Sequence, residues 1–307
     1  MKNSLYDLQR LGALRDALAT LDVAAAPTAK VLFPASLPPL RRIGLLCGSF
    51  NPLTLAHTEL AEQARLTAGL DLVLFTLAKV TVDKERVTGL SLVDRLLLLS
   101  FYAQRRPQLG VALVNRGLYF EQAQAFRSLL GDQVVLFFVV GMDKLVQILD
   151  PKYYQDRDAA LRQLFALTSL IVANRGAMAR MEFDQVLDRS ENQPYRSSIH
   201  FCSLSNTVAE LSATTVREEL AASKIPKSVI PEETTAFLEE TKAFYPPVTI
   251  GEEKVDVYDM RQQVLHSLLA DVSPPYGKEN FQALFQRALS ASEEGKMLRR
   301  ALSPADQ

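Results

Sequence analysis

The sequence predicts an α/β fold with a mostly parallel sheet, and three observations favour this class. The chain has 307 residues, 48% of them hydrophobic, and a formal net charge of −1, which suits a globular protein with a sizeable core. From residue 43 onward, apolar runs of strand length alternate with segments of helical periodicity. The runs are almost continuously apolar, which is typical of strands covered on both faces.

The first segment, residues 1–40, is expected to lie beside this fold. Leucines recur at helical spacing over residues 4–21 and predict an amphipathic helix. Four prolines follow between Pro27 and Pro39, so we expect an extended linker that lies on a surface.

The middle segment, residues 41–247, is expected to form the sheet domain. Strands are predicted at 43–48, 71–78, 111–115, 134–141, 169–174 and 200–204. Helices are predicted at 54–67, 91–106, 119–130, 143–149, 158–167, 214–223 and 231–244. Such alternation indicates a parallel sheet, which binds ligands at the carboxyl ends of its strands, near a switch in strand order.

The last segment, residues 248–307, is expected to add a helical extension. It is polar at first and then amphipathic over 257–272 and 280–289. The apolar faces of the terminal helices need covering. They can wrap the core or form a homo-oligomer interface, and the sequence leaves both alternatives open.

The charge pattern and the missing motifs argue against several classes of function. The chain has no five-residue basic block, so neither a nucleic-acid partner nor an anionic membrane surface is expected. The signatures GxGxxG, GxxxxGK[ST], GxSxG and HExxH are absent. Their absence disfavours a hydride-transfer dinucleotide fold, a P-loop kinase and a zinc protease.

The cysteines and the hydropathy pattern bear on metals and location. Cys47 and Cys202 lie far apart and form no CxxC pair, so we expect neither a disulfide framework nor a metal site built on cysteine. The N-terminus has no run resembling a signal peptide, and no stretch reaches about 18 uninterrupted apolar residues. A cytoplasmic protein without a membrane partner is therefore expected.

The stretch GSFNPLTLAH, residues 48–57, indicates an anion site between a strand and a helix. Gly48 ends the strand, where a residue without Cβ lets a phosphate approach, and Ser49 and Phe50 offer backbone N–H groups. The helix beginning near Thr54 directs its positive end to the same place. Thr54 and His57 lie one turn apart and share a face. The alternative is a helix-capping turn with a surface histidine.

The stretch LSATTVREEL, residues 211–220, carries hydroxyls and a cation at the start of another helix. Ser212 and Thr214 can cap that helix and can also donate to a phosphate. Arg217 lies on the same face as Thr214 and can offer a charge-assisted fork to phosphate oxygens. The alternative is an ordinary capping box with a solvated Arg217.

Together the two stretches resemble the signatures of a known superfamily. GSFNPLTLAH is similar to the GxFxPxTxxH variant of the HxGH signature of nucleotidyltransferases, and LSATTVR resembles their ISSTxxR motif. The FNP version most closely resembles nicotinamide or nicotinic acid mononucleotide adenylyltransferases. The resemblance covers about residues 43–245. It implies a Rossmann-like, doubly wound parallel sheet of the nucleotidyltransferase type, with helices added at both ends of the chain.

Other segments fit the same resemblance. VVGMDKL, with Gly141 and Asp143, resembles the family's GxD motif, whose aspartate contacts a nucleotide ribose. Lys84 falls in a segment that resembles the family's lysine-then-helix stretch near the phosphates. Asn174, in VANRG, matches the strand end that borders the adenine pocket.

The sequence departs from the family pattern in two places. Leu211 and Ala213 replace the isoleucine and the second serine of the ISST pattern, which removes one hydroxyl donor. The family often stacks the pyridine ring on tryptophan, whereas this chain has none. Tyr119 or Phe120 could take that place, or both could be core aromatics.

The resemblance implies that the 5′-phosphate of a pyridine mononucleotide attacks the α-phosphorus of ATP and releases pyrophosphate. His57 would contact the α-phosphate, assisted by Thr54 and by the backbone around residues 49–50. Ser212, Thr214 and Arg217 would hold the β- and γ-phosphates. Mg²⁺ would enter with ATP, and no metal site built from protein side chains is expected.

Two alternatives to this function stay open. The same transfer could act on another phosphorylated acceptor, such as a phosphopantetheine-type or phospho-sugar compound, or use CTP in place of ATP. The chain could also be a nucleotide-binding homologue that has lost catalysis.

Overall fold

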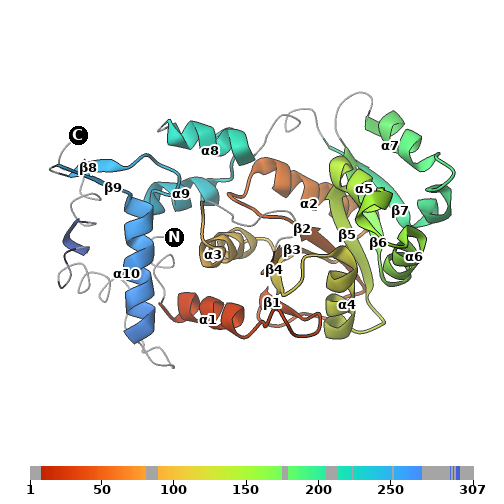
Figure 1. Cartoon of the computed structure of the whole chain (residues 1–307), viewed down its shortest axis with the longest axis horizontal. Helices are drawn as coiled ribbons and strands as arrows, with labels where there is room; N and C mark the ends of the chain where they lie inside the picture. The colour runs from red at the N-terminus through yellow and green to blue at the C-terminus, as the bar shows by residue number, and fades with distance from the viewer. Residues whose placement is uncertain are drawn as a thin grey trace.

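The computed structural model describes residues 8–80, 89–174, 179–204, 213–222, 224–250 and 252–271, with residues 291, 293 and 295–297 (Figure 1). The predictions for Lys84 and Ser212, and the helix predicted at 280–289, lie outside these residues.

A seven-stranded sheet forms the centre of the molecule, in the order β1-β4-β3-β2-β5-β6-β7. The strands are β1 (Ala29–Phe33), β2 (Arg42–Cys47), β3 (Leu72–Ala78), β4 (Leu109–Val114), β5 (Val135–Gly141), β6 (Ser169–Asn174) and β7 (Ile199–Ser203). All neighbours pair in parallel except β1 and β4. The strand order reverses between β2 and β5, as in a doubly wound, Rossmann-like sheet.

Helices cover both faces of this sheet. On one face, α2 (Leu55–Ala68) and α3 (Leu92–Ala103) pack against the sheet. The same hydrophobic cluster also includes residues of α1 (Leu8–Ala19), α8 (Ala213–Ala221), α9 (Glu232–Thr241) and α10 (Val257–Asp271). The other face carries α4 (Tyr119–Leu130), α5 (Met142–Leu149), α6 (Arg157–Leu167) and α7 (Ala179–Leu187). The 3-10 helices η1 (Pro151–Tyr153) and η2 (Gln193–Ser198) and the hairpin β8 (Val248–Ile250) and β9 (Glu253–Val255) complete the described elements.

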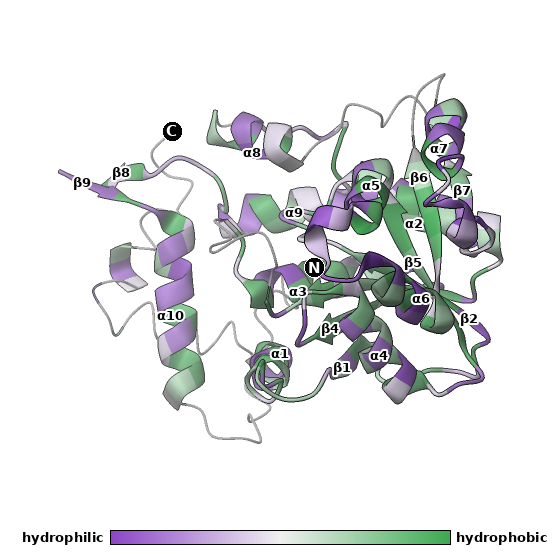
Figure 2. Cartoon of the chain, turned by 45° about the vertical axis from the view of Figure 1, so that its right-hand side comes forward, coloured by the Kyte–Doolittle hydropathy of each residue, from purple (hydrophilic) through white to green (hydrophobic). Residues whose placement is uncertain are grey.

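The apolar runs in the sequence are explained by this double covering. Along β5, Leu136 and Phe138 belong to the hydrophobic cluster on one face, whereas Phe137 and Val139 belong to the cluster on the other. Successive side chains of a strand point to opposite faces, so both sets must be apolar. Figure 2 shows the strands as predominantly hydrophobic and the helices as mixed.

The prediction of a surface linker is partly wrong, because this segment contributes a strand to the sheet. Residues 29–33 form β1, with Ala29 opposite Val114 of β4. The preceding helix is also fixed to the core: Leu11 is buried, and Lys79 Nζ donates to two carbonyls near the end of α1. The prolines surround β1 rather than interrupt it, which an edge strand tolerates.

The other predicted strands and the described helices are observed, and those of their predicted ends that fall within the described residues differ by less than one helical turn. The sequence patterns do not predict α7, η1, η2 or the β8–β9 hairpin. Of the helices that the structure describes, none is long and apolar enough to cross a membrane.

Candidate active site

The loop that joins β2 to α2, residues 48–54, lies where the strand order reverses. We call it the β2–α2 loop. The neighbouring strand β5 runs parallel to β2 and leads directly into α5. In a doubly wound sheet, ligands bind outside the carboxyl ends of the strands at such a point. Two separately predicted motifs, at 48–57 and 141–143, therefore meet at one edge of the sheet.

Phe50 shapes this loop, and its backbone adopts a left-handed φ of 43°. Its buried ring makes edge contacts with His57, at 5.1 Å between ring centroids, and with Phe75, at 5.3 Å. A Cβ on Gly48 would lie 3.0 Å from Cζ of Phe50. Gly48 therefore makes room for the Phe50 ring, a reason that differs from the close phosphate approach expected from sequence. Left-handed backbone in a bulky residue is typical of constrained, functional turns.

The turn presents backbone donors. In the described part of the chain, the amides of Ser49 and Phe50 donate to no other residue. The amide of Leu55, at the start of α2, donates to the carbonyl of Val229 at 3.0 Å. Two adjacent unpaired amides beside a helix N-terminus suit an anion, because buried N–H groups need acceptors.

His57 completes a capping box at the start of α2. Its Nδ1 accepts a hydrogen bond from the Thr54 amide at 3.1 Å and lies 2.8 Å from the Thr54 hydroxyl. Because an amide can only donate, Nδ1 carries no proton and the neutral ring is protonated at Nε2. The capping alternative and the anion-site hypothesis are thus compatible, since the cap orients the ring and leaves Nε2–H as a donor.

The surroundings of His57 fix its charge. Burial lowers the pKa of His57 to about 4, so the ring is uncharged at neutral pH. Thr54 is only 1% exposed, and its hydroxyl lies within hydrogen-bond distance of Nδ1 of His57. Thr54 therefore orients the His57 ring. Among the residues described, none bonds Nε2 of His57. The arrangement offers a neutral hydrogen-bond donor in a fixed direction.

Arg217 brings the second motif onto the same loop. Its Nη1 donates to the carbonyl oxygen of Asn51 at 2.8 Å, and its Nη2 donates to the hydroxyl of Thr214 at 2.9 Å. Thr214 is exposed and Arg217 is half-buried. These bonds use two of the five N–H donors of a guanidinium. The first turn of α8 and the β2–α2 loop therefore form one cluster of hydroxyls, amides and a cation.

Three further predicted residues end parallel strands or follow them. Gly141 ends β5, and a Cβ placed on it would meet no described atom within 4 Å. Asp143 is exposed in the first turn of α5. Asn174 ends β6, opposite Ser203 of β7. The open space at Gly141 is what a ligand at the strand ends would require.

A cavity of about 270 Å³ is built from the segment after β4 and from α5, η1 and α6. Its aromatic lining includes Tyr119, Phe120, Tyr153 and Tyr154, and Lys144 is its cationic side chain. The ring of Tyr119 is packed edge-on against the core residue Phe138, with 4.9 Å between centroids. A cavity with aromatic walls and one cation suits a flat ring that carries an anionic group.

Cys47, the last residue of β2, directly precedes the β2–α2 loop. Burial raises the pKa of the Cys47 thiol well above its ordinary value, and the nearby positive charge of Lys144 opposes that shift. The thiol donates to Oε1 of Gln122 in α4 at 3.1 Å. Lys144 is therefore within electrostatic range of the residue that precedes the β2–α2 loop.

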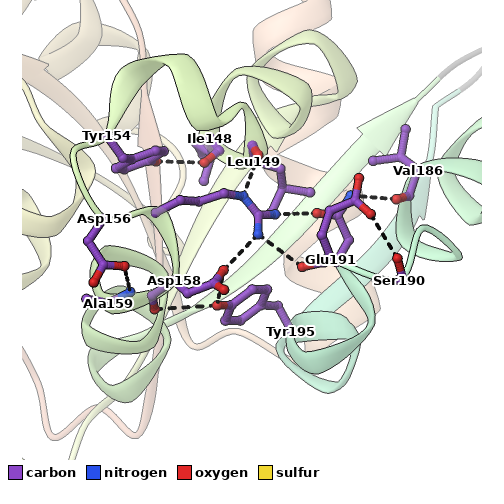
Figure 3. Close-up of polar contacts among 12 residues, drawn as sticks. Ile148, Leu149, Tyr154, Asp156, Asp158, Ala159, Val186, Ser190, Glu191 and Tyr195 are labelled. Atoms are coloured by element: carbon purple, nitrogen blue, oxygen red, sulfur yellow. Dashed lines mark hydrogen bonds and ion pairs between the residues drawn. The ribbon is translucent and has the colours of Figure 1, made fainter.

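The turn between α5 and α6 holds Tyr153 at this cavity. Figure 3 shows the hydroxyl of Tyr154 donating to the carbonyl of Ile148, at 2.6 Å. Arg157 also binds the end of α5, because its Nε donates to the carbonyl of Leu149 at 2.8 Å. Tyr153 itself is 50% exposed. The backbone of the turn is thus fixed, and the Tyr153 ring is accessible to a ligand.

Lys144 and Tyr153 are not singled out by the sequence patterns. Lys144 directly follows Asp143, and Tyr153 lies in the run PKYY after a proline. Each alone is an ordinary surface residue, and only the tertiary structure places both on one cavity. The available signal was their position just after the GxD motif in a chain that lacks tryptophan.

The chain is similar to known proteins in sequence. Residues 45–219 match the sequence model of the family described as cytidylyltransferase-like. A probable nicotinate-nucleotide adenylyltransferase of Trichlorobacter lovleyi is 28% identical over 224 residues, which cover 67% of this chain and all of that protein. A probable nicotinate-nucleotide adenylyltransferase of Bordetella pertussis is 28% identical over 200 residues, which cover 64% of this chain and 94% of that protein.

The solved structures similar to this chain include that of Plasmodium falciparum nicotinic acid mononucleotide adenylyltransferase complexed with APC. It has a TM-score of 0.48 and 13% sequence identity, and the superposition covers 66% of this chain and 97% of that one.

Proposed function

Because this chain belongs to the cytidylyltransferase-like family of nucleotidyltransferases, we propose that it transfers the adenylyl group of ATP to nicotinic acid mononucleotide. An oxygen of the mononucleotide 5′-phosphate attacks the α-phosphorus of ATP, the bond to the bridging oxygen of the β-phosphate breaks, and pyrophosphate leaves. The product is the deamido form of NAD. The attacking phosphate is already anionic, so no side chain has to remove a proton or become covalently attached.

In this proposal, catalysis consists of positioning and of stabilising charge on the phosphates. Nε2–H of His57 donates to an oxygen of the α-phosphate, where negative charge grows as the new bond forms. Two observations support this role: Nδ1 is occupied by the cap of Thr54, and the ring is neutral. The amides of Ser49 and Phe50 assist from the turn.

Arg217 and Thr214 bind the β- and γ-phosphates of ATP in this proposal. Their support is the exposed position of Thr214 and the bond that fixes Arg217 to the β2–α2 loop. Ser212 and Lys84 are proposed to add a hydroxyl and a positive charge to the same phosphates. Asp143 is proposed to bind a ribose.

The adenine side of the site is proposed from strand ends. Asn174 ends β6, and Gly141 ends the adjacent strand β5 with open space beside it. A glycine at this place lets a nucleotide approach the backbone closely. The two positions are therefore proposed to border the adenosine of ATP.

The acceptor is proposed to bind in the cavity that Lys144 and Tyr153 line. The exposed Tyr153 ring can stack on the pyridine ring, the task for which the family often uses tryptophan. Lys144 can pair with the carboxylate of nicotinic acid, whereas the amide of the nicotinamide form offers it no negative charge. The names of the curated relatives favour the same acceptor.

Mg²⁺ takes part in this proposal as the counter-ion of ATP. Over the described ranges, no group of three or more His, Cys, Asp or Glu is placed to hold a metal ion. Phosphate oxygens and water suit Mg²⁺ as ligands, so the cation can enter the site on ATP itself.

One observation carries the proposal: the bond between Arg217 and the carbonyl of Asn51. It joins two motifs whose chemistry is complementary to a triphosphate, at the strand ends where a doubly wound sheet binds nucleotides.

A substrate panel scored by pyrophosphate release tests the assignment. ATP and CTP are each paired with nicotinic acid mononucleotide, nicotinamide mononucleotide and phosphopantetheine. We expect the fastest release from ATP with nicotinic acid mononucleotide. Strong release with phosphopantetheine, or with CTP, and none with either pyridine mononucleotide would overturn the choice of acceptor or donor.

A further inference from the structure

A buried polar cluster joins α10 to the first turn of α3. Asp94 of α3 is 1% exposed and accepts from Oη of Tyr258 at 2.7 Å, from Nη1 of Arg261 at 2.9 Å and from Nε2 of Gln262 at 2.5 Å. Arg261 is itself only 2% exposed. Such an ion pair is weak evidence for stability, because the loss of hydration of two charges offsets their attraction. The cluster does, however, fix the orientation of α3 against α10.

The same end of α3 also holds the β2–α2 loop. The amide of Leu90 donates to Oδ1 of Asn51 at 3.0 Å, and the next amide, of Ser91, donates to Oη of Tyr258 at 2.8 Å. Two consecutive amides are thus bound by different segments of the chain. One amide donates to the loop and the other to α10, so adjacent backbone residues link Tyr258 to Asn51.

Arg95 provides a second attachment between α3 and the loop. Its Nη1 donates to the carbonyl oxygen of Ser49 at 3.2 Å, and its side chain is 7% exposed. Arg95 directly follows Asp94, whose carboxylate is fixed by α10. The position of the Ser49 turn therefore depends on the same helical turn that α10 orients.

We propose that α10 positions the β2–α2 loop for adenylyl transfer and that Tyr258 is a positioning residue. This inference rests on the proposed function. Figure 1 shows α10 at the end of the molecule away from β6, β7 and α7. The curated relatives are matched over 94% and 100% of their lengths by about two thirds of this chain, so the remaining third has no counterpart in them. The match to the family model ends at residue 219, so α10 lies outside the matched residues.

The test compares Tyr258→Phe with Tyr245→Phe. The first variant keeps the apolar ring and removes the hydroxyl that joins Ser91 and Asp94. The second removes a half-buried phenol that forms no hydrogen bond in the described part of the chain. Hydrogen–deuterium exchange is measured for peptides covering residues 48–54, and kcat and KM are measured with ATP and nicotinic acid mononucleotide.

For Tyr258→Phe we expect loop exchange to quicken and kcat to fall on the order of tenfold, with KM for ATP within about threefold of wild type. If Tyr258 had only a structural role, Tyr258→Phe would lower the melting temperature but would not lower kcat while leaving KM for ATP nearly unchanged. Tyr245→Phe is expected to match wild type in both measurements.

Unchanged exchange at residues 48–54 would overturn the positioning role, whatever the value of kcat. Faster exchange with unchanged kcat would also overturn it. Wild-type protein that turned over no acceptor would defeat the proposed function instead, and the exchange data would still decide whether Tyr258 holds the loop. If Tyr258→Phe does not fold, Gln262→Met is used as the test variant in its place. It removes one donor to Asp94, and we expect faster loop exchange and lower kcat, both to a smaller extent.

Discussion

Arg217 Nη1 lies 2.8 Å from the carbonyl oxygen of Asn51, although 166 residues separate the two in sequence. The bond fixes the first turns of α8 to the β2–α2 loop. Asn51 is held from the other side as well, because its side chain accepts from the Leu90 amide at the start of α3. Each of the following predictions concerns a residue attached to this loop or to the cavity beside it.

Arg217→Lys should lower kcat/KM for ATP about 10- to 100-fold, the range that a lost hydrogen bond to a charged group produces. Lysine keeps the charge but cannot reproduce the planar fork. Steady-state kinetics with varied ATP give the ratio. Arg196→Lys, on a surface pair with Asp184, is the matched control and should behave as wild type. Equal behaviour of the two variants would remove Arg217 from the site.

His57→Ala should lower kcat on the order of 10²–10³-fold, the effect of removing one preorganised donor. It should lower stability by only about 1 kcal/mol, the usual cost of a lost helix cap. Turnover and thermal unfolding together separate the two effects. The matched control is His266→Ala, on the exposed side of α10. Near-normal turnover of His57→Ala would contradict the role of His57.

The His57 ring should stay uncharged down to low pH. The fold lowers its pKa from the ordinary value of 6.5 to about 4, so folding favours the neutral form. The stability that this ring contributes is complete above pH 6.5 and is lost as the pH falls toward 4. An NMR titration of the ring Cε1–H, assigned by its absence in His57→Ala, should be flat above about pH 5. A midpoint near 6.5 would contradict the desolvated, capped ring.

Lys144→Gln should reduce selectivity for the acid form of the acceptor. We expect the ratio of kcat/KM for nicotinic acid mononucleotide to that for nicotinamide mononucleotide to fall about tenfold or more, because a charge-assisted bond is lost. Lys227→Gln, which removes an exposed lysine paired with Glu239, should leave the ratio unchanged. An unaltered ratio in Lys144→Gln would show that Lys144 does not meet the carboxylate.

Much of this fold could be predicted from the sequence because its signals are local. The parallel strands β2 to β6 are largely buried on both faces, so each reads as a short apolar run, as β5 does. His57 and Arg217 were predictable because each lies one helical turn from a capping hydroxyl, Thr54 and Thr214. A fixed spacing on one helix needs no knowledge of the rest of the chain.

The features that the sequence did not predict depend on contacts between distant segments. The strand β1 is short and proline-flanked, and only its pairing with β4 defines it. The buried pair of Asp94 and Arg261 joins residues that lie 167 positions apart. The contact between Gly48 and the ring of Phe50 was also not predicted, because it depends on a left-handed conformation of Phe50 that no local pattern indicates.

The most direct test of the central claim is the stoichiometry of one reaction. Purified protein is incubated with ATP, Mg²⁺ and nicotinic acid mononucleotide, and the nucleotides and phosphates are quantified by ³¹P NMR. The account predicts equal amounts of deamido-NAD and pyrophosphate, formed at a rate that falls on the order of 10²–10³-fold in His57→Ala. Binding of ATP by calorimetry without release of pyrophosphate from any acceptor would contradict it and leave a nucleotide-binding protein without transferase activity.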